Sequence, residues 1–300
     1  MIRMVLKLPP FEYFEPHSLE QACDLLSKYR GKAALLAGGT NLLVQMKLGR
    51  RRPQAVINLK RIPKLSYVAH SDEGLRIGAL TTIREILRST VVKEHFTALW
   101  EAAQVMAFPN IRNIATIGGN ICNAAPTADL PPPLMALGAR VVARSSRGLR
   151  SIALADFFQG PNKTSLSEDE VLVEVFIPNP PRNTSSTYLK LPSRTLEDIS
   201  VAGVAVSLSL NGQEVKSLRL ALGAVAPVPI LVREAEEIAK GRRVDQQLID
   251  EVAEEASRKV NPPKSELWDF RAPAEYRREV VKVLTKRALR KVLGSLGWSG

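Results

Sequence analysis

The sequence contains only two cysteines among its 300 residues, Cys23 and Cys122. A cysteine-ligated iron–sulfur cluster takes four thiolates, so this chain has too few to hold one. Two cysteines are also too few for a framework of disulfides. If iron and sulfur take part in the chemistry of this protein, another chain must hold them.

Histidine is equally scarce, and His17, His70 and His95 lie far apart in the sequence. They form no HExxH motif and no closely spaced pair, so we expect no metal site and no catalytic triad. No serine or cysteine stands in a nucleophile elbow, and Cys122 is interpreted as a small apolar residue. Hydrolase chemistry is therefore disfavoured.

Long apolar runs are also missing. Lys7 and two prolines interrupt the N-terminal run, so neither a signal peptide nor a membrane span is predicted, and we expect a cytoplasmic protein. With 45% apolar and 24% charged residues, the composition is that of an ordinary globular protein. The length favours two domains.

What the sequence has in excess is positive charge, with a net charge of +12. A basic nucleotide-binding or nucleic-acid-binding protein is therefore an alternative, but charge alone favours it. The densest basic run, residues 47–52 (KLGRRR), is short and accompanies no zinc-finger or leucine-zipper spacing, so we expect no nucleic acid. An anionic ligand such as a diphosphate, or an acidic partner subunit, explains the charge equally well.

Periodicity and turn signals predict an α+β fold. The prolines of residues 178–181 mark the clearest linker, and Asn211-Gly212 predicts a hairpin between two strands beyond it. We therefore place one domain at residues 1–178, divided at about 58/59, and a second, antiparallel sheet plus helices, at residues 184–296. Expected helices include 18–29, 95–106, 132–137, 244–258 and 273–293, and expected strands include 33–37, 55–59, 74–80, 139–143, 170–177, 200–210 and 217–225, with a loop over 116–129.

Two glycine pairs carry the strongest chemical signal, one in residues 37–41 (AGGTN) and one in residues 116–120 (TIGGN). A glycine pair lets consecutive backbone N–H groups point at one anion. Two matched loops suit the two phosphates of a pyrophosphate, although each pair alone is compatible with an ordinary turn. Neither pair has the spacing of a Rossmann or P-loop motif.

Three ordered strings, AGGTNLLVQMK, RNIATIGGNICNAAPTADLPPPLMALGARV and YLKLPSRTLEDIS, resemble the FAD-binding medium subunits of the xanthine dehydrogenase and carbon monoxide dehydrogenase family. The resemblance continues through DFFQGPNKTSLSEDEVLVEVFIP and DFRAPAEYRREVVKVLTKRAL, so it covers nearly the whole chain. It implies a FAD-binding fold of the vanillyl-alcohol-oxidase (PCMH) type, followed by the small C-terminal domain of carbon monoxide dehydrogenase flavoproteins.

Residue by residue, the resemblance implies that the two glycine loops bind the FAD diphosphate and that Asp129 supports the adenosine-side loop. It brings Tyr188, Lys190, Asp198 and Ile199 near the flavin ring, with Lys190 and Asp198 as the catalytic candidates. Asn41 and Ser200 depart from the commonest residues of the family but remain small and polar. The cofactor-binding candidates are Ala37, Gly38, Gly39, Thr40, Asn41, Thr116, Ile117, Gly118, Gly119, Asn120, Asp129, Tyr188, Lys190, Asp198 and Ile199.

The implied function is that of the FAD-carrying subunit of a molybdenum hydroxylase, an oxidoreductase. Electrons would pass from a 2Fe-2S subunit through FAD to an external acceptor. The implied partners are a large subunit with the molybdenum cofactor and a small 2Fe-2S subunit, assembled as a dimer of heterotrimers. The substrate and the acceptor stay open. The alternative enzyme is a self-contained FAD-dependent oxidoreductase. Val at Gly39 or Gly119 is expected to fill space that the phosphates need.

Overall fold

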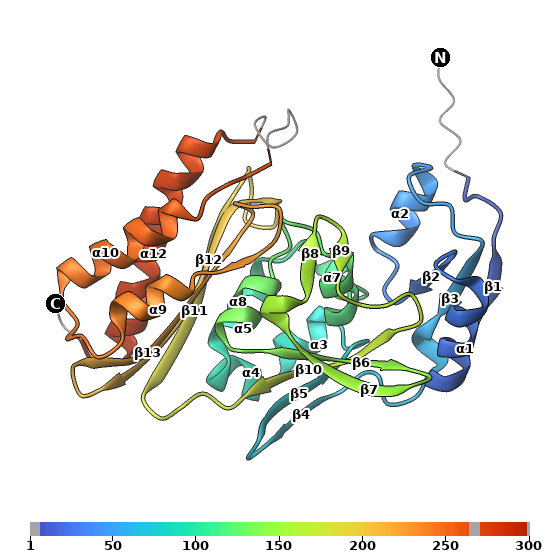
Figure 1. Ribbon diagram of the computed structural model, residues 1–300, viewed down its shortest axis with the longest axis horizontal. Helices are drawn as coiled ribbons and strands as arrows, with labels where there is room; N and C mark the ends of the chain where they lie inside the picture. Colours follow the sequence, from blue (N-terminus) through green and yellow to red (C-terminus); the bar gives the residue numbers. More distant parts are fainter. Residues whose placement is uncertain (1–6, 264–270, 299–300) are drawn as a thin grey trace.

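A computed structural model describes residues 7–263 and 271–298 of the chain (Figure 1). Asp269 and Phe270, which open the last family-like string, lie outside the described residues, as do residues 1–6 of the first expected domain. The described residues form three main sheets that follow one another along the chain. No described helix is both long enough and apolar enough to span a bilayer.

The first sheet contains three parallel strands in the order β1-β3-β2. Ser18 begins its first helix by accepting a hydrogen bond from the Gln21 N–H, as a capping residue does. The strand β2 is central to the argument below because it leads directly into the first glycine pair. The elements are β1 (Glu12–Phe14), α1 (Leu19–Tyr29), β2 (Ala33–Leu36), α2 (Leu42–Lys47), β3 (Ala55–Asn58) and the short helix η1 (Leu59–Arg61).

The second sheet contains five antiparallel strands in the order β4-β5-β10-β6-β7, and its core includes side chains from α3, α5, α7 and α8. The C-terminal half of the domain returns to the sheet through β10, which pairs with both β5 and β6. The elements are β4 (Val68–Ser71), β5 (Gly74–Gly78), α3 (Ile83–Arg88), α4 (Thr90–His95), α5 (Thr97–Val105), α6 (Pro109–Arg112), α7 (Ile117–Asn123), α8 (Pro131–Ala136), β6 (Arg140–Ser145), β7 (Gly148–Ala153), η2 (Leu154–Asp156), β8 (Phe158–Gly160), β9 (Lys163–Thr164) and β10 (Val171–Pro178).

The third sheet is antiparallel, in the order β11-β12-β13-β14, and has one helical layer on each face (Figure 1). Along β12 the side chains alternate between the two faces. Val204 and Val206 pack in the core under α9, α10 and α12, while Ala205 joins the core of the second sheet. The elements are β11 (Thr184–Pro192), β12 (Ser200–Asn211), β13 (Glu214–Gly223), β14 (Ile230–Leu231), α9 (Arg233–Ala239), α10 (Gln246–Arg258) and α12 (Ala274–Ser295).

The predicted α+β class and the antiparallel sheet of the C-terminal domain are confirmed. Two local predictions are wrong. The expected loop over residues 116–129 contains α7, which Thr116 caps by accepting a hydrogen bond from the Gly119 N–H. The expected helix over residues 95–106 begins only at Thr97, because the fully buried Phe96 has non-helical backbone angles, φ −127° and ψ 47°.

Candidate functional site

The first glycine loop leaves a row of backbone donors without partners. It follows β2 directly, and Gly39 has a φ of +75°, which glycine adopts without a steric penalty. Within the described part of the chain, no hydrogen bond uses the N–H groups of Gly38, Gly39, Thr40 or Asn41. The Asn41 side chain does not cap α2, since its Oδ1 accepts from Gln45 Nε2 at 2.9 Å. Four consecutive donors are therefore available to an anion.

Both glycines of this loop are needed by the protein's own packing. A Cβ on Gly38 would stand 2.1 Å from the carbonyl oxygen of Ile114, which leads into the second glycine loop. A Cβ on Gly39 would meet Leu36 and Leu43 at about the closest distances that real contacts reach. A side chain at Gly38 would clash with the backbone, and one at Gly39 would be strained by the positive φ and would press on two leucine side chains, so valine at Gly39 would test packing as well as space for a ligand.

The second glycine loop uses its backbone donors internally. The N–H groups of Ile117 and Gly118 donate to the carbonyl oxygens of Thr81 and Ala79, at 3.0 and 2.9 Å. The Gly119 N–H donates to Thr116 Oγ1 at 3.1 Å. A Cβ on Gly119 would therefore crowd that hydroxyl, at 2.9 Å, and would lie 3.7 Å from Ala37 Cβ across the gap. The two loops face each other, and the N–H groups of the second glycine pair, unlike those of the first, already have acceptors within the protein.

Asn120, at the end of the second loop, has one unpaired polar atom. Its Oδ1 is buried and has no hydrogen-bond partner among the described residues, while its Nδ2 lies 3.9 Å from Met106 Sδ. A buried acceptor without a partner costs free energy, about 1–3 kcal/mol, unless a ligand or water supplies a donor. This atom is a second polar group that the protein alone does not satisfy.

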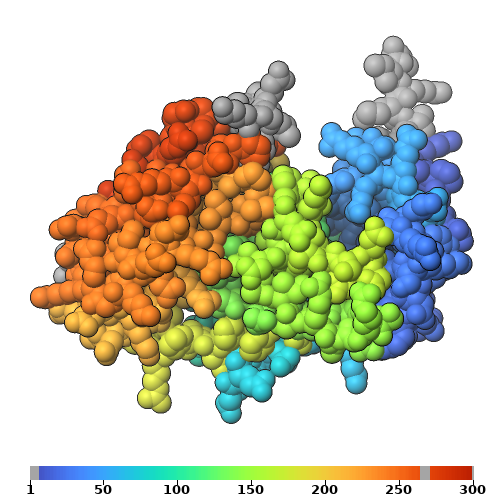
Figure 2. Space-filling model, viewed as in Figure 1, coloured from blue at the N-terminus to red at the C-terminus, as the bar shows by residue number. Residues whose placement is uncertain are grey.

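A cavity of about 450 Å³ lies between the two loops. Figure 2 shows the recess at its mouth, between the blue N-terminal part of the chain and the yellow-green segment that precedes β10. Ile117 does not line the cavity, because its side chain is fully buried in the core. The predicted residues that do line it are Ala37, Gly38, Gly39, Thr40, Asn41, Thr116, Gly118, Gly119 and Asn120.

Asp129 lies in a separate, buried polar cluster. Its Oδ1 accepts hydrogen bonds from Tyr188 Oη at 2.9 Å and from Ser200 Oγ at 2.7 Å, and its Oδ2 lies 3.2 Å from Lys190 Nζ. Burial raises the pKa of Asp129, and the Lys190 charge opposes that rise. The hydrogen bonds of Asp129 join it to the third sheet, and its support of the adenosine-side loop stays a prediction.

Lys190 is saturated by acceptors of the protein itself. Its side chain is only 1% exposed, and Nζ donates to Val105 O at 2.9 Å, to Asp129 Oδ2 and to Asp198 O at 3.1 Å. An ammonium group has three donors, so none is left over. The cluster thereby ties the end of α5 to the segment before β12.

Asp198 and Ile199 lie on the outer side of this cluster. The Asp198 carboxylate pairs with Arg194 at 2.7 Å, and this hydrogen bond holds the pKa of Asp198 below its ordinary value. Ile199 is 42% exposed. The structure therefore brings Tyr188, Lys190 and Asp129 together and leaves the two neighbouring side chains facing outward.

The comparisons with known proteins agree over almost the whole chain. Residues 9–180 match the FAD binding domain in molybdopterin dehydrogenase, and residues 186–292 match the CO dehydrogenase flavoprotein C-terminal domain. The chain belongs to this family of FAD-binding medium subunits. It is 34% identical to the glyceraldehyde dehydrogenase medium chain of Sulfolobus acidocaldarius, with 95% of this chain and 99% of that one aligned.

Two further relatives support the assignment. The chain is 33% identical to the xanthine dehydrogenase FAD-binding subunit of Escherichia coli O157:H7, over 95% of this chain and 97% of the relative. A chain of carbon monoxide dehydrogenase from Hydrogenophaga pseudoflava superposes with a TM-score of 0.91 at 33% identity, covering 96% and 99% of the two chains. The sequence-based assignment to the molybdenum hydroxylases, with FAD as the cofactor of this chain, is confirmed.

The cavity of this chain has further lining residues that sequence reasoning missed. Gln45, Arg51, Cys122 and Glu168 all line it. Cys122 lines the cavity, and its side chain is exposed there. Gln45, Cys122 and Glu168 lie within the family-like strings without a signal of their own, Arg51 lies beyond the first string, and the fold brings the four together from separate segments.

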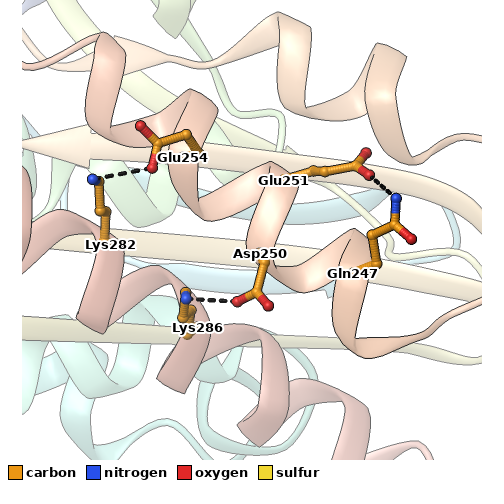
Figure 3. A pocket seen from close by; sticks show the side chains of 6 residues that line it. All are labelled: Gln247, Asp250, Glu251, Glu254, Lys282 and Lys286. Carbon is orange, nitrogen blue, oxygen red and sulfur yellow. Dashed lines mark hydrogen bonds and ion pairs between the residues drawn. The ribbon is translucent and has the colours of Figure 1, made fainter.

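Another hollow lies between α10 and α12, far along the chain from the glycine loops (Figure 3). Its charges already pair with one another, with Lys282–Glu254 at 3.0 Å and Lys286–Asp250 at 2.6 Å. It is an open groove of surface ion pairs and offers no unsatisfied group. Within the described residues, no group of three or more histidine, cysteine, aspartate or glutamate side chains could hold a metal ion.

Proposed function

We propose that this chain holds the diphosphate of FAD on the free N–H groups of residues 38–41. This row of donors is the observation that carries the proposal. Backbone N–H groups arranged around a concave loop bind phosphate oxygens strongly, and glycine lets them approach closely. The remaining predicted contacts, from Ala37 and from Thr116 to Asn120, lie on the walls of the same cavity, apart from the buried Ile117.

Asn120 supports the same placement. Its unpaired Oδ1 needs a donor, and the hydroxyls of the ribityl or ribose part of FAD provide donors of the right kind. An apolar ligand would leave this atom unsatisfied. A hydroxyl-rich dinucleotide therefore fits the cavity better than an apolar substrate does.

Bound FAD supplies the electron-transfer chemistry, and the protein supplies binding and orientation. We propose that Lys190 acts chiefly by position. Its ammonium holds the carbonyl of Val105, next to the cavity residue Met106, and the carbonyl of Asp198, next to the exposed Ile199. Its positive charge also favours negative charge on a flavin ring placed beside Met106. Tyr188 and Asp129 hold the lysine in place.

We further propose that this chain works inside a cytoplasmic complex with a large molybdenum-cofactor subunit and a small 2Fe-2S subunit, as a dimer of heterotrimers. The relatives are described as medium chains and subunits, which supports a multi-subunit assembly. The two cysteines of this chain cannot ligate a cluster, so the electron donor must dock from outside. The substrate is bound by the large subunit in this scheme.

Co-expression with the neighbouring genes tests the proposal. The complex should contain molybdenum and iron, and denaturation should release FAD without FMN, because a row of donors for a diphosphate is superfluous for a mononucleotide. Metal analysis and chromatography of the released flavin are the measurements. A chain that purifies alone and oxidises a small substrate with FAD as its only cofactor would instead be a self-contained oxidoreductase.

A further inference from the structure

The cavity carries opposite charges at its two ends. Its lining includes one cation, Arg51, and two carboxylates, Glu168 and Glu170. Ala33, Ala34 and Leu35 of β2 also line the cavity, and β2 runs from the segment that contains Gly31 to the first glycine loop. Four residues of strand span about 13 Å, which is comparable to the length of half a dinucleotide.

The positive end adjoins the free donors of the first glycine loop. Arg51 follows α2, and its backbone N–H donates to the carbonyl oxygen of Gln45 at 3.3 Å, so the chain folds back toward the loop. The Gln45 side chain in turn donates to Asn41. Arg51 lines the cavity, and its side chain has no hydrogen bond or ion pair with any described residue.

The negative end lies at the start of β2. A Cβ on Gly31 would stand 2.5 Å from Glu168 Oε1, so the Glu168 carboxylate packs directly against the glycine that precedes the strand. No described residue donates a hydrogen bond to this carboxylate. Glu170 differs, because it is buried and both of its oxygens accept from Arg150, at 2.5 and 2.6 Å. Only Glu168 is a free carboxylate in the cavity.

We infer that these charges fix the direction of FAD in the cavity: Arg51 pairs with the diphosphate, and Glu168 accepts hydrogen bonds from the ribose hydroxyls of the adenosine half. A diphosphate beside Glu168 would be repelled, whereas hydroxyls are donors that a carboxylate accepts well. The flavin ring gains negative charge on reduction. We therefore place it away from the Glu168 carboxylate, on the side of Met106 and Lys190. The adenine would then lie against the aliphatic side chains of Leu26, Leu59 and Leu172.

This inference rests on the proposed function, and three ligands separate its parts. FAD, ADP and FMN all carry phosphate, but only FAD and ADP carry adenosine. The full-length chain, stripped of flavin, is titrated with each one, by flavin fluorescence for FAD and FMN and by calorimetry for ADP. The variants are Arg51→Gln and Glu168→Gln. Their matched controls are the adjacent Arg50→Gln and Asp169→Asn, whose side chains do not line the cavity.

Arg51→Gln should lower the affinity for all three ligands. Glu168→Gln should lower the affinity for FAD and ADP by roughly tenfold or more and leave the affinity for FMN within about twofold, since hydrogen bonds to a charged group are the stronger kind. Both controls should bind as the unchanged chain does. Tighter binding of all three ligands by Glu168→Gln would show that the carboxylate only repels phosphate. An equal loss of affinity for FMN in this variant would show that the cofactor runs in the opposite direction. Either result overturns the inference, as does an affinity of Arg51→Gln equal to that of the unchanged chain. If the unchanged chain binds no flavin, the proposed function itself fails.

Discussion

The first glycine loop and the Lys190 cluster are both polar, and they differ in how far the protein satisfies them. The loop has four consecutive N–H groups without an acceptor. In the cluster, Lys190 has three acceptors and Asp129 has three donors. The four unpaired N–H groups belong to residues that line the cavity, so they mark a place for an anionic ligand. The saturated set marks a structural device that holds neighbouring segments in place.

The same contrast separates the two glycine pairs. In both, a glycine is required because backbone approaches backbone, at Ile114 for Gly38 and at Ala79 for Gly118. The N–H groups of the second pair donate to acceptors within the protein, while those of the first pair do not. A glycine pair therefore indicates close packing in both loops. The two loops differ in whether the N–H groups of the pair already have acceptors within the protein.

The largest effect is expected in the saturated cluster. Lys190→Met should lower the free energy of unfolding by about 3–5 kcal/mol, because it leaves the buried Asp129 carboxylate without its cation. Denaturant titration measures the loss. A double variant with Asp129→Asn should recover part of it, because the unpaired charge is then gone as well. Lys291→Met, which breaks the half-exposed pair with Glu101, should cost at most about 1 kcal/mol.

The pH dependence of this variant has a definite sign. Burial already raises the pKa of Asp129 above 3.8, and Lys190 opposes the rise, so removing Lys190 raises the pKa further. The folded state then binds a proton more tightly than the unfolded state does. The stability of Lys190→Met should fall, relative to the unchanged chain, as the pH rises from about 4 through the raised pKa. A difference that shrinks with rising pH would mean that Asp129 is not the group left unpaired.

The next effect concerns the packing of the binding loop. Gly38→Ala places a Cβ 2.1 Å from a backbone carbonyl oxygen, so we expect a loss of about 1–3 kcal/mol and a loop displaced from Ile114. FAD retention should fall together with stability. Gly294→Ala is the control, because its Cβ would meet open space in α12, and it should gain up to about 1 kcal/mol. Normal stability of Gly38→Ala would show that the glycine serves the ligand alone.

Much of the fold was predictable because its signals are local. Asn211-Gly212 predicted the hairpin of β12 and β13, and runs of small and β-branched residues predicted both strands. The helix α7 was not predictable in the same way. The N–H groups of Ile117 and Gly118 find their acceptors at Thr81 and Ala79, more than thirty residues earlier. A glycine pair followed by short polar residues looks like a loop until that distant segment is in place.

The site was predictable only where a motif marks it. The glycine pairs themselves pointed to the two loops, Tyr188, Lys190 and Asp198 came from resemblance to a family, and the structure adds how their polar groups are paired. Arg51 and Glu168 could not be found from the sequence, because a charged residue on a surface segment is ordinary. Their meaning depends on a cavity that residues from the first two sheets build together.

The smallest effect is expected from a comparison of two asparagines. Because the side chains are the same, this comparison tests most directly whether unpaired and saturated groups differ in role. Asn120 Oδ1 has no partner, whereas Asn58 donates to Tyr13 Oη at 2.7 Å and Glu15 Oε1 at 2.9 Å and accepts from the Lys60 N–H at 3.2 Å. Asn120→Ala should weaken the binding of FAD by about 1 kcal/mol, roughly fivefold in affinity, yet change the stability of the flavin-free chain little. Asn58→Ala should do the reverse, losing about 1–3 kcal/mol of stability and keeping its affinity for FAD. Thermal unfolding and flavin titration of the same preparations give both numbers. If Asn120→Ala instead destabilises the flavin-free chain as much as Asn58→Ala does, then Asn120 is a structural residue and an unpaired atom is a poor guide to this binding site.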